Sequence, residues 1–287
     1  MNKIDFNGSL LEGDSNFLSQ GNRGLRYGDA LFETMRCSNG MIFFWEEHYL
    51  RLMASMRMLR MEIPMNFTLE VLEDSILKLL AANALDKGAA RIRFTVFRKD
   101  GGLYLPKTNE ISYTIESESL TSPFYVLNEE AYEVELYKDF YVNPDMLSTL
   151  KTNNKILNVT GSIYAKENGY DNCLLLNTAK QVVEALNGNL FIVNGHNVKT
   201  PALSDGCLNG IIRQKLIGII EKTQDVEMEV AAISPFELQK ADELFITNSI
   251  VGIQPITKYR KKEFKHEIAK SLLGKLNASA RLTSTKF

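Results

Sequence analysis

The stretch from Leu150 to Glu184 decides the fold, and it reads LKTNNKILNVTGSIYAKENGYDNCLLLNTAKQVVE. Lys151 stands in a polar segment just before an amphipathic pattern, which predicts a helix over residues 154–168. Two short apolar runs follow and predict strands, and the second of them ends in an isolated acid, Glu184. A lysine before a helix and a carboxylate at the end of a strand are the two groups around which we expect a site.

Composition sets the limits of the interpretation. The chain has 287 residues, of which 45% are hydrophobic and 24% charged, so it can bury a sizeable core and divide into two domains. A net charge of −2 gives no basic footprint, and we expect no nucleic-acid partner. No apolar run is long enough for a membrane span or a signal peptide, which favours a cytoplasmic protein without a membrane partner.

The cysteine and histidine patterns exclude several classes of enzyme. The three cysteines, Cys37, Cys173 and Cys207, are odd in number and lack the spacing of a metal site, as expected of reduced thiols. The chain has no HExxH, CxxC or GxxxxGK[ST] motif. We therefore expect no metal ligands and no P-loop.

The first part of the chain, residues 1–118, carries both strand and helix patterns and is followed by a polar stretch at 119–124 that is a candidate linker. Alternating and apolar patterns predict its strands, Asn39-Gly40 predicts a hairpin turn, and helical periodicity predicts two helices. The expected strands are 2–7, 22–37, 89–98 and 111–116, and the expected helices are 46–61 and 69–85.

The remainder, residues 125–287, predicts a larger mixed domain. Gly169 suits a left-handed C-cap for the helix at 154–168, and Asn194-Gly195 predicts another hairpin. The expected strands are FYVL, YEVELY, 172–176, 181–184, 189–193, VEMEVAAI and 243–247, and the further helices are 211–222, 235–240 and 263–278.

Lys151 has the features of a lysine that attacks an aldehyde. Such a lysine must be deprotonated, and a nearby cation lowers the pKa of a lysine toward that state. Lys155 lies one helical turn away and is a neighbour of the right kind. A solvated loop lysine is the alternative, and only the surrounding motifs weigh against it.

The start of the helix at 211–222 could hold a phosphate. Gly206 and Gly210 flank this start, and the backbone N–H groups of Ile211 and Ile212 have no partner within the helix. A simple glycine turn before a helix is the alternative.

Three polar side chains could complete such a site. Arg51 could pair with the phosphate, or be an exposed helix arginine; Ser249 could add a hydroxyl, or be an ordinary turn serine. Glu184 lies in an apolar strand and needs a partner, which could be a protonated ring nitrogen or a neighbouring arginine.

Six segments, in order along nearly the whole chain, resemble the motifs of one family. They are RYGDALFET (26–34), HYLRL (48–52), KTNNK (151–155), VVEALNGNLFIV (182–193), TPALSDGCLNGIIR (200–213) and ELFITNS (243–249). The chain resembles the class IV, or fold-type IV, pyridoxal-phosphate (PLP) dependent aminotransferases, which include branched-chain aminotransferase, D-amino-acid aminotransferase and aminodeoxychorismate lyase.

The resemblance implies a fold, a cofactor and residue roles. The fold is α+β with two domains, a small α/β sandwich and a larger domain with a β-barrel-like core, and the protein is expected to be a homodimer. Lys151 is the expected catalytic residue and binds PLP through an imine. The other expected cofactor contacts are Glu184 at the pyridine nitrogen, and Arg51, Ile211, Ile212 and Ser249 at the phosphate.

The same resemblance suggests the substrate contacts. Tyr27 and Phe32 are expected to line the substrate pocket, with core packing as the alternative. Arg93 is expected to bind a substrate carboxylate, and Arg98, at the end of the same strand, is a further candidate. A solvent-facing strand arginine is the alternative for Arg93.

The features that separate family members are mixed. Asn154 is similar to the lyase and D-aminotransferase pattern, whereas Ile156 stands where branched-chain enzymes carry a tyrosine, and Leu103 stands where the lyase carries an arginine. We expect an aminotransferase for small amino acids and 2-keto acids, with branched-chain ones as candidates. The alternatives are aminodeoxychorismate lyase and a PLP-binding scaffold without turnover.

Overall fold

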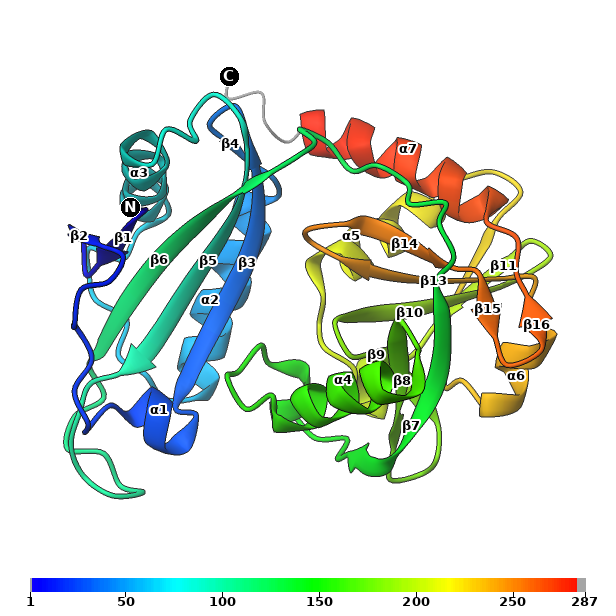
Figure 1. The fold of residues 1–287 in the computed structure, drawn as a ribbon, viewed down its shortest axis with the longest axis horizontal. Helices are drawn as coiled ribbons and strands as arrows, with labels where there is room; N and C mark the ends of the chain where they lie inside the picture. Colours follow the sequence, from blue (N-terminus) through cyan, green and yellow to red (C-terminus); the bar gives the residue numbers. More distant parts are fainter. Residues whose placement is uncertain (1, 283–287) are drawn as a thin grey trace. The chain divides into compact units, whose positions relative to one another are not determined.

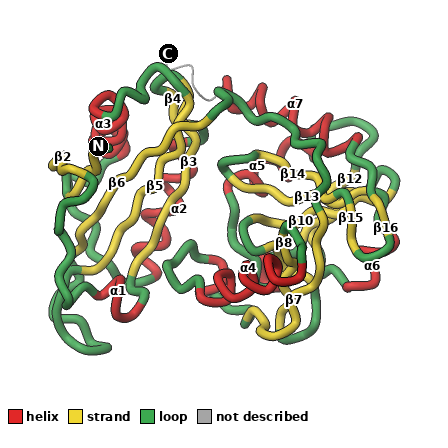
Figure 2. The backbone as a smooth tube through the Cα atoms, viewed as in Figure 1, coloured by secondary structure: helices red, strands yellow, loops and turns green. Residues whose placement is uncertain are grey.

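The computed structural model describes residues 2–282, and the chain forms two compact units (Figures 1 and 2). Within the described residues, the first unit contains residues 2–124, together with 151–154 and 280–282. The second unit contains residues 125–150 and 155–279. The four residues that begin with Lys151 therefore leave the second half of the chain and join the first unit.

The first unit is an antiparallel sheet in the order β2-β1-β6-β5-β3-β4, and two long helices pack on it. Helix α2 packs on β3, and helix α3 packs on β1 and β6. Its elements are β1 (Lys3–Phe6), β2 (Ser9–Glu12), α1 (Arg23–Tyr27), β3 (Ala30–Ser38), β4 (Met41–Ile42), α2 (Trp45–Met58), α3 (Leu69–Ala82), β5 (Ala89–Arg98) and β6 (Ile111–Leu120).

A short helix replaces the first part of the strand expected over 22–37. Asn22 accepts a hydrogen bond from the backbone N–H of Leu25 at 2.8 Å and begins α1, and Gly28 ends the helix at φ +63°. The prediction of a continuous strand was wrong for these residues, because an Asn cap and a glycine six residues later are the two ends of a helical turn. Strand β3 begins only at Ala30.

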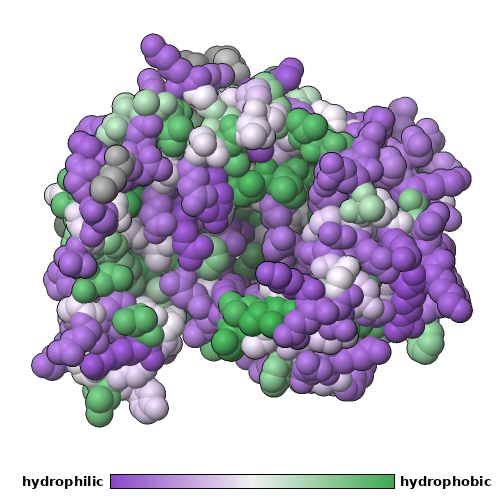
Figure 3. Space-filling view, viewed as in Figure 1, coloured by the Kyte–Doolittle hydropathy of each residue, from purple (hydrophilic) through white to green (hydrophobic). Residues whose placement is uncertain are grey.

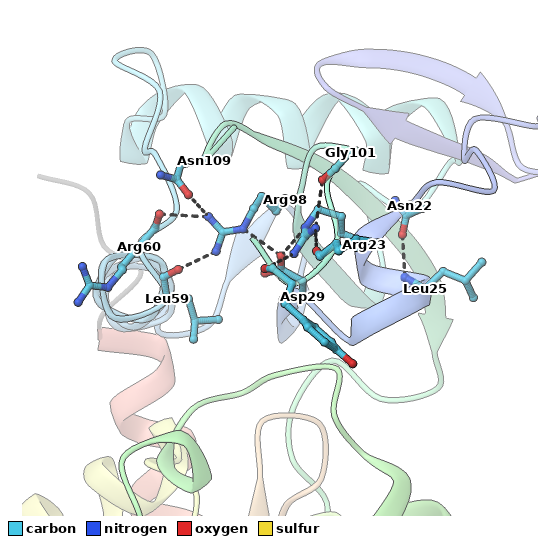
Figure 4. A network of polar contacts seen from close by, with 11 residues as sticks. Asn22, Arg23, Leu25, Asp29, Leu59, Arg60, Arg98, Gly101 and Asn109 are labelled. Atoms are coloured by element: carbon cyan, nitrogen blue, oxygen red, sulfur yellow. Dashed lines mark hydrogen bonds and ion pairs between the residues drawn. The ribbon is translucent and has the colours of Figure 1, made fainter. Parts of the chain in front are cut away.

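Asp29, directly after that turn, anchors two buried arginines (Figure 4). Its Oδ2 accepts hydrogen bonds from Nε of Arg23 and from Nε of Arg98, both at 2.9 Å. Arg98 also donates to the carbonyls of Leu59 and Arg60 and to Oδ1 of Asn109. This single carboxylate therefore ties α1 to β5 and to the end of α2.

Arg23 shapes the loop after β5 in the same way. Its two Nη atoms donate to the carbonyls of Gly101, Leu103 and Tyr104, at 3.1, 2.6 and 3.3 Å. One buried guanidinium thus binds three backbone carbonyls of the loop.

The second unit is built on a ten-stranded sheet in the order β12-β11-β10-β9-β8-β7-β15-β16, with β13 on β10 and β14 on β13. In the described residues this path branches and does not close, so the barrel-like core expected from the sequence is an open sheet. Its elements are β7 (Glu133–Val142), α4 (Ile156–Asn168), β8 (Asn172–Asn177), β9 (Val182–Ala185), β10 (Gly188–Asn194), β11 (Asn197–Thr200), α5 (Ile211–Ile220), β12 (Glu227–Val230), α6 (Pro235–Lys240), β13 (Glu243–Asn248), β14 (Gly252–Ile256), β15 (Lys258–Tyr259), β16 (Lys262–Glu263) and α7 (Glu267–Leu282), with short 3₁₀ turns at Leu147–Thr149 and Leu203–Asp205.

Most other elements lie within a few residues of their predicted ranges. Asn39-Gly40 makes the β3–β4 turn, and Gly169 caps α4 at φ +75°. Two predictions fail. The segment FYVL (124–127) forms no strand, and the strand expected at 111–116 runs on as β6 to Leu120, into the residues expected to form a linker. Backbone pairing with β5 continues that strand, and local polarity does not reveal this.

Asp29→Asn should destabilise the protein by about 3 kcal/mol, because it leaves two buried guanidiniums without their carboxylate. Urea unfolding at neutral pH measures this. Glu118→Gln is the matched control: it removes the exposed partner of Arg91 in the same sheet, and should cost less than about 1 kcal/mol. Equal effects of the two substitutions would contradict the anchoring role of Asp29.

Candidate functional site

Lys151 is held against an edge of the first unit's sheet. The backbone N–H of Phe32 donates to the carbonyl of Lys151 at 2.9 Å, and that of Asn153 donates to the carbonyl of Ala30 at 3.0 Å. Leu31 and Thr152 form the antiparallel bridge between these bonds. The segment is therefore a short added strand on β3, and its backbone is fixed by tertiary pairing.

The side chains of Phe32, Arg93 and Lys151 lie together on this part of the sheet. Nζ of Lys151 lies 4.3 Å from the centre of the Phe32 ring, and the guanidinium carbon of Arg93 lies 3.9 Å from it. Nη2 of Arg93 also donates to Oδ1 of Asn153 at 3.4 Å. The structure thus brings three of the predicted site residues into one cluster. Arg93 lies on an aromatic ring and does not simply face solvent.

Arg51 is part of a buried group on α2. Glu33 accepts from Nε of Arg51 at 2.8 Å and also pairs with its Nη2, and Oε2 of Glu33 lies 2.7 Å from Nδ1 of His48. The side chain of Arg51 is only 9% exposed, which excludes the alternative of an exposed helix arginine. Glu33 fixes the plane of the guanidinium.

The charges in this group follow from its burial. Burial alone would raise the pKa of Glu33, but the Arg51 guanidinium and the His48 hydrogen bond more than offset it and hold the pKa at about 2. Burial lowers the pKa of His48, helped by the charges of Arg51 and Lys151 and opposed by Glu33. At neutral pH Glu33 is therefore an ionised carboxylate beside the Arg51 guanidinium, and His48 is a neutral ring that donates through Nδ1.

Glu184 lies on β9 in the second unit, next to the loop that leads into α5. Its Oε2 accepts from the backbone N–H of Leu208 at 2.8 Å. Asn189, opposite it on β10, donates to the carbonyl of the same Leu208 at 2.8 Å. Two polar side chains of adjacent strands thus bind the N–H and the carbonyl group of Leu208, and so hold the loop before α5.

The start of α5 is free of side-chain capping. Gly210 is its N-cap and has no side-chain hydrogen bond to offer. A Cβ added to Gly210 would lie 2.0 Å from Oδ1 of Asn189, so only glycine fits this close approach. The N–H groups of Ile211 and Ile212 begin the helix and have no acceptor within it. This arrangement suits an anion such as a phosphate.

Ser249, Tyr27 and Arg98 have different surroundings. Ser249 lies in the turn between β13 and β14, and its carbonyl accepts from the hydroxyl of Tyr125 at 3.2 Å. Tyr27 is half-buried beside Tyr104, with their ring centres 5.7 Å apart. Arg98 is 6% exposed, and Asp29, Asn109 and backbone carbonyls engage its guanidinium, so its N–H groups are not available to a substrate carboxylate.

Known proteins identify the family. The model of a family described as amino-transferase class IV matches residues 30–259. The chain belongs to this family. A relative from Methanocaldococcus jannaschii, which carries the name of a branched-chain-amino-acid aminotransferase, is 32% identical over 255 residues, covering 88% of this chain and 86% of the relative. A D-alanine aminotransferase from Listeria monocytogenes is 29% identical over 264 residues, covering 89% and 86%.

Solved structures agree on the fold. The branched-chain aminotransferase of Thermoproteus uzoniensis, solved with norvaline, superposes with a TM-score of 0.87 at 24% identity, over 99% of this chain and 96% of that one. At this identity the likeness establishes the fold, and the two-unit α+β architecture expected from the motifs is confirmed.

Sequence reasoning missed three residues of these groups. Glu33 and His48 lie inside two of the quoted motifs. Glu33 was expected on a strand and His48 on a helix, and nothing in the sequence shows that the two side chains form a hydrogen bond. Asn189 was likewise quoted only as part of its motif. The signal that could have found them is burial, since a buried carboxylate or amide requires a partner.

Within residues 2–282, no group of three or more His, Cys, Asp or Glu side chains is placed to hold a metal ion. No helix in this range combines the length and the hydropathy needed to cross a membrane.

A fall in pH should lower the free energy of unfolding of the wild-type protein more than that of Glu33→Gln. A carboxylate with a lowered folded-state pKa stabilises the protein above its unfolded pKa of 4.5, and this contribution is lost as the pH falls toward about 2. Between pH 5 and pH 3 we expect Glu33 to account for about 2 kcal/mol of lost stability.

Urea unfolding of both proteins at several pH values in this range tests the prediction. The difference in unfolding free energy between wild type and Glu33→Gln should shrink as the pH falls. A constant difference would show that the buried pairing with Arg51 does not lower the pKa of Glu33.

Proposed function

We propose that the protein is a PLP-dependent aminotransferase that transfers the amino group of a small amino acid to a 2-keto acid. The observation that carries this proposal is the fixed position of Lys151. Its backbone is paired with β3 and its Nζ lies over the Phe32 ring, which is unlike a solvated loop lysine. Membership of the class IV family supplies the chemical context.

The chain offers the contacts that PLP requires. The first turn of α5, capped by Gly210 against Asn189, would hold the phosphate through the N–H groups of Ile211 and Ile212, with Arg51 and Ser249 as further donors. Thr247 on β13 has a buried hydroxyl without a hydrogen-bond partner among the described residues, which makes it a further candidate contact for the cofactor.

Glu184 would contact the pyridine nitrogen of the cofactor. Its carboxylate lies at the end of β9, where the Leu208 N–H orients one oxygen. A carboxylate in this role accepts a hydrogen bond from the pyridinium N–H and so keeps that nitrogen protonated. PLP, when bound, supplies the electron sink that stabilises negative charge at the substrate α-carbon.

Lys151 would have two roles. Its amine would hold the aldehyde of the cofactor, and the same amine would serve as the general base that moves the α-proton of the substrate. Phe32 restricts the position of Nζ on one side, and the pairing with β3 fixes the backbone. Arg93, held on the Phe32 ring and by Asn153, would bind the substrate carboxylate.

Branched-chain amino acids are the first donors to test, because the relative from Methanocaldococcus jannaschii carries that name. D-alanine is the second, because of the relative from Listeria monocytogenes. The three cysteines are free and buried, which supports the cytoplasmic location suggested by the sequence.

Lys151→Ala should abolish both transamination and the visible absorbance of lysine-bound PLP. Activity is measured as keto-acid formation from L-leucine, L-glutamate or D-alanine with 2-oxoglutarate as acceptor. Lys155→Ala is the matched control, because it removes a charge from the same segment but leaves the amine of Lys151, and it should keep the PLP absorbance.

Three outcomes would contradict the proposal. Full activity of Lys151→Ala would exclude Lys151 as the catalytic lysine. Formation of pyruvate and 4-aminobenzoate from aminodeoxychorismate, with no keto-acid acceptor, would replace the aminotransferase with the lyase. PLP bound without turnover of any donor would favour the scaffold alternative.

We also propose that the active protein is a homodimer. The first unit exposes the loop residues Leu103, Tyr104 and Leu105, at 75, 90 and 84%, in the loop whose carbonyls Arg23 binds. The second unit exposes Ile156, Val159 and Ile163 along one side of α4, at 75, 51 and 52%. Much of the face seen in Figure 3 is hydrophilic, with separate hydrophobic patches. Exposed apolar groups of this kind are typical of surfaces that a partner covers.

Sedimentation equilibrium at micromolar concentration should therefore give twice the chain mass. Replacing Leu103 and Leu105 together by serine should shift the protein toward monomer, since it removes apolar area that the second copy would bury. A wild-type monomer would contradict the proposal.

A further inference from the structure

The group around Arg51 carries no net charge. The Glu33 carboxylate balances the Arg51 guanidinium through Nε and Nη2, and the neutral His48 ring adds none. Arg51 can therefore offer N–H groups to a phosphate but brings no excess positive charge. A phosphate monoester carries a charge of about −1.5 to −2 at neutral pH, so this charge requires compensation elsewhere.

Arg213 is a buried arginine without an acidic partner. It is the third residue of α5 and is 4% exposed. Its Nη2 donates to the carbonyl of Pro201 at 2.7 Å, while its Nε is buried and finds no acceptor within residues 2–282. Across the same residues no carboxylate lies within ion-pair distance of Arg213.

The neighbours of Arg213 do not neutralise it. Burial lowers the pKa of Arg213, and the only opposing group is Cys207. Burial raises the pKa of Cys207 to about 12, so this thiol is uncharged at neutral pH. Arginine remains protonated in proteins, and a buried charge without a partner is costly. The structure thus keeps a full positive charge inside the second unit.

This charge lies in the first turn of α5. A Cβ added to the cap residue Gly210 would lie 3.6 Å from Cβ of Arg213, so the arginine side chain begins beside the uncapped helix start. The helix dipole also places positive potential there. Thr247, on the strand against which α5 packs, adds a second buried donor without an acceptor. The side chain of Arg213 and the uncapped helix start thus place positive potential in the first turn of α5, where an anion would compensate it.

We propose that Arg213 is the counter-ion of the PLP phosphate, and that it supplies the positive charge that the Arg51–Glu33–His48 group does not. This inference rests on the proposed function, because it needs PLP at α5. Pro201 holds one end of the guanidinium in place, so the effect acts through the electric field at the helix start and does not require the side chain to move.

The test compares PLP with pyridoxal, which has the same aldehyde and ring but no phosphate. Dissociation constants of both ligands are measured by absorbance titration for wild type, Arg213→Gln and Arg213→Lys. Arg213→Gln should weaken PLP binding by about tenfold or more and pyridoxal binding by less than about twofold, because only the phosphate senses the charge. Arg213→Lys keeps the charge and should restore most of the preference for PLP.

A second pair of variants neutralises Arg213 without removing it. Cys207→Asp places a carboxylate beside the guanidinium and should reduce the preference for PLP as Arg213→Gln does. Cys207→Ser is its neutral control and should not. Lys199→Gln removes another largely buried positive charge of the second unit, but one already paired with Glu229 and Glu237, and should leave the preference unchanged.

The outcomes separate this inference from the function on which it rests. Equal loss of PLP and pyridoxal binding in Arg213→Gln, or no rescue by lysine, would show that Arg213 is only structural. A wild-type preference for PLP that survives both Arg213→Gln and Cys207→Asp would overturn the inference alone. A wild-type protein that binds pyridoxal as well as PLP would instead remove the phosphate site itself.

Discussion

The pairing of residues 151–153 along the edge of β3 is the interaction on which the proposed chemistry depends. Strand β4 pairs only with Cys37 and Ser38 at the far end of β3. The edge at Ala30–Phe32 is therefore open to a segment from later in the chain, and two backbone hydrogen bonds hold that segment there. Because its backbone is fixed, the amine of Lys151 needs only a few side-chain torsions to be defined.

The alternation of side chains along β3 gives this one strand two tasks. Phe32 and Glu33 are adjacent and point to opposite faces of the sheet. Phe32 contacts Lys151 and Arg93 on one face, while Glu33 engages Arg51 and His48 of α2 on the other. A one-residue slip of β3 would exchange these faces and lose both groups together. The motif RYGDALFET therefore organises the lysine and the arginine of the first unit.

The sequence predicted those features that are encoded locally. Periodicity located α2, α3, α4 and β5, and Gly169 and Asn39-Gly40 marked a helix end and a turn. The motifs that contain Lys151, Arg51 and Glu184 identified the family to which the chain belongs. The sequence did not predict features that depend on contacts between distant parts of the chain. No local pattern shows that residues 151–154 join the first unit. Nor does one show that Arg98 pairs with Asp29, or that Arg213 is buried without an acidic partner. Each of these depends on which distant groups meet after folding.

The most direct test of the central claim is the identification of the lysine that binds PLP. The protein is incubated with PLP, reduced with borohydride to trap the lysine adduct, and digested for mass spectrometry. The account predicts a phosphopyridoxyl group on the peptide that contains Lys151, at about one per chain, and none on Lys155. Labelling of a different lysine, or diffuse labelling of many exposed lysines, would contradict it.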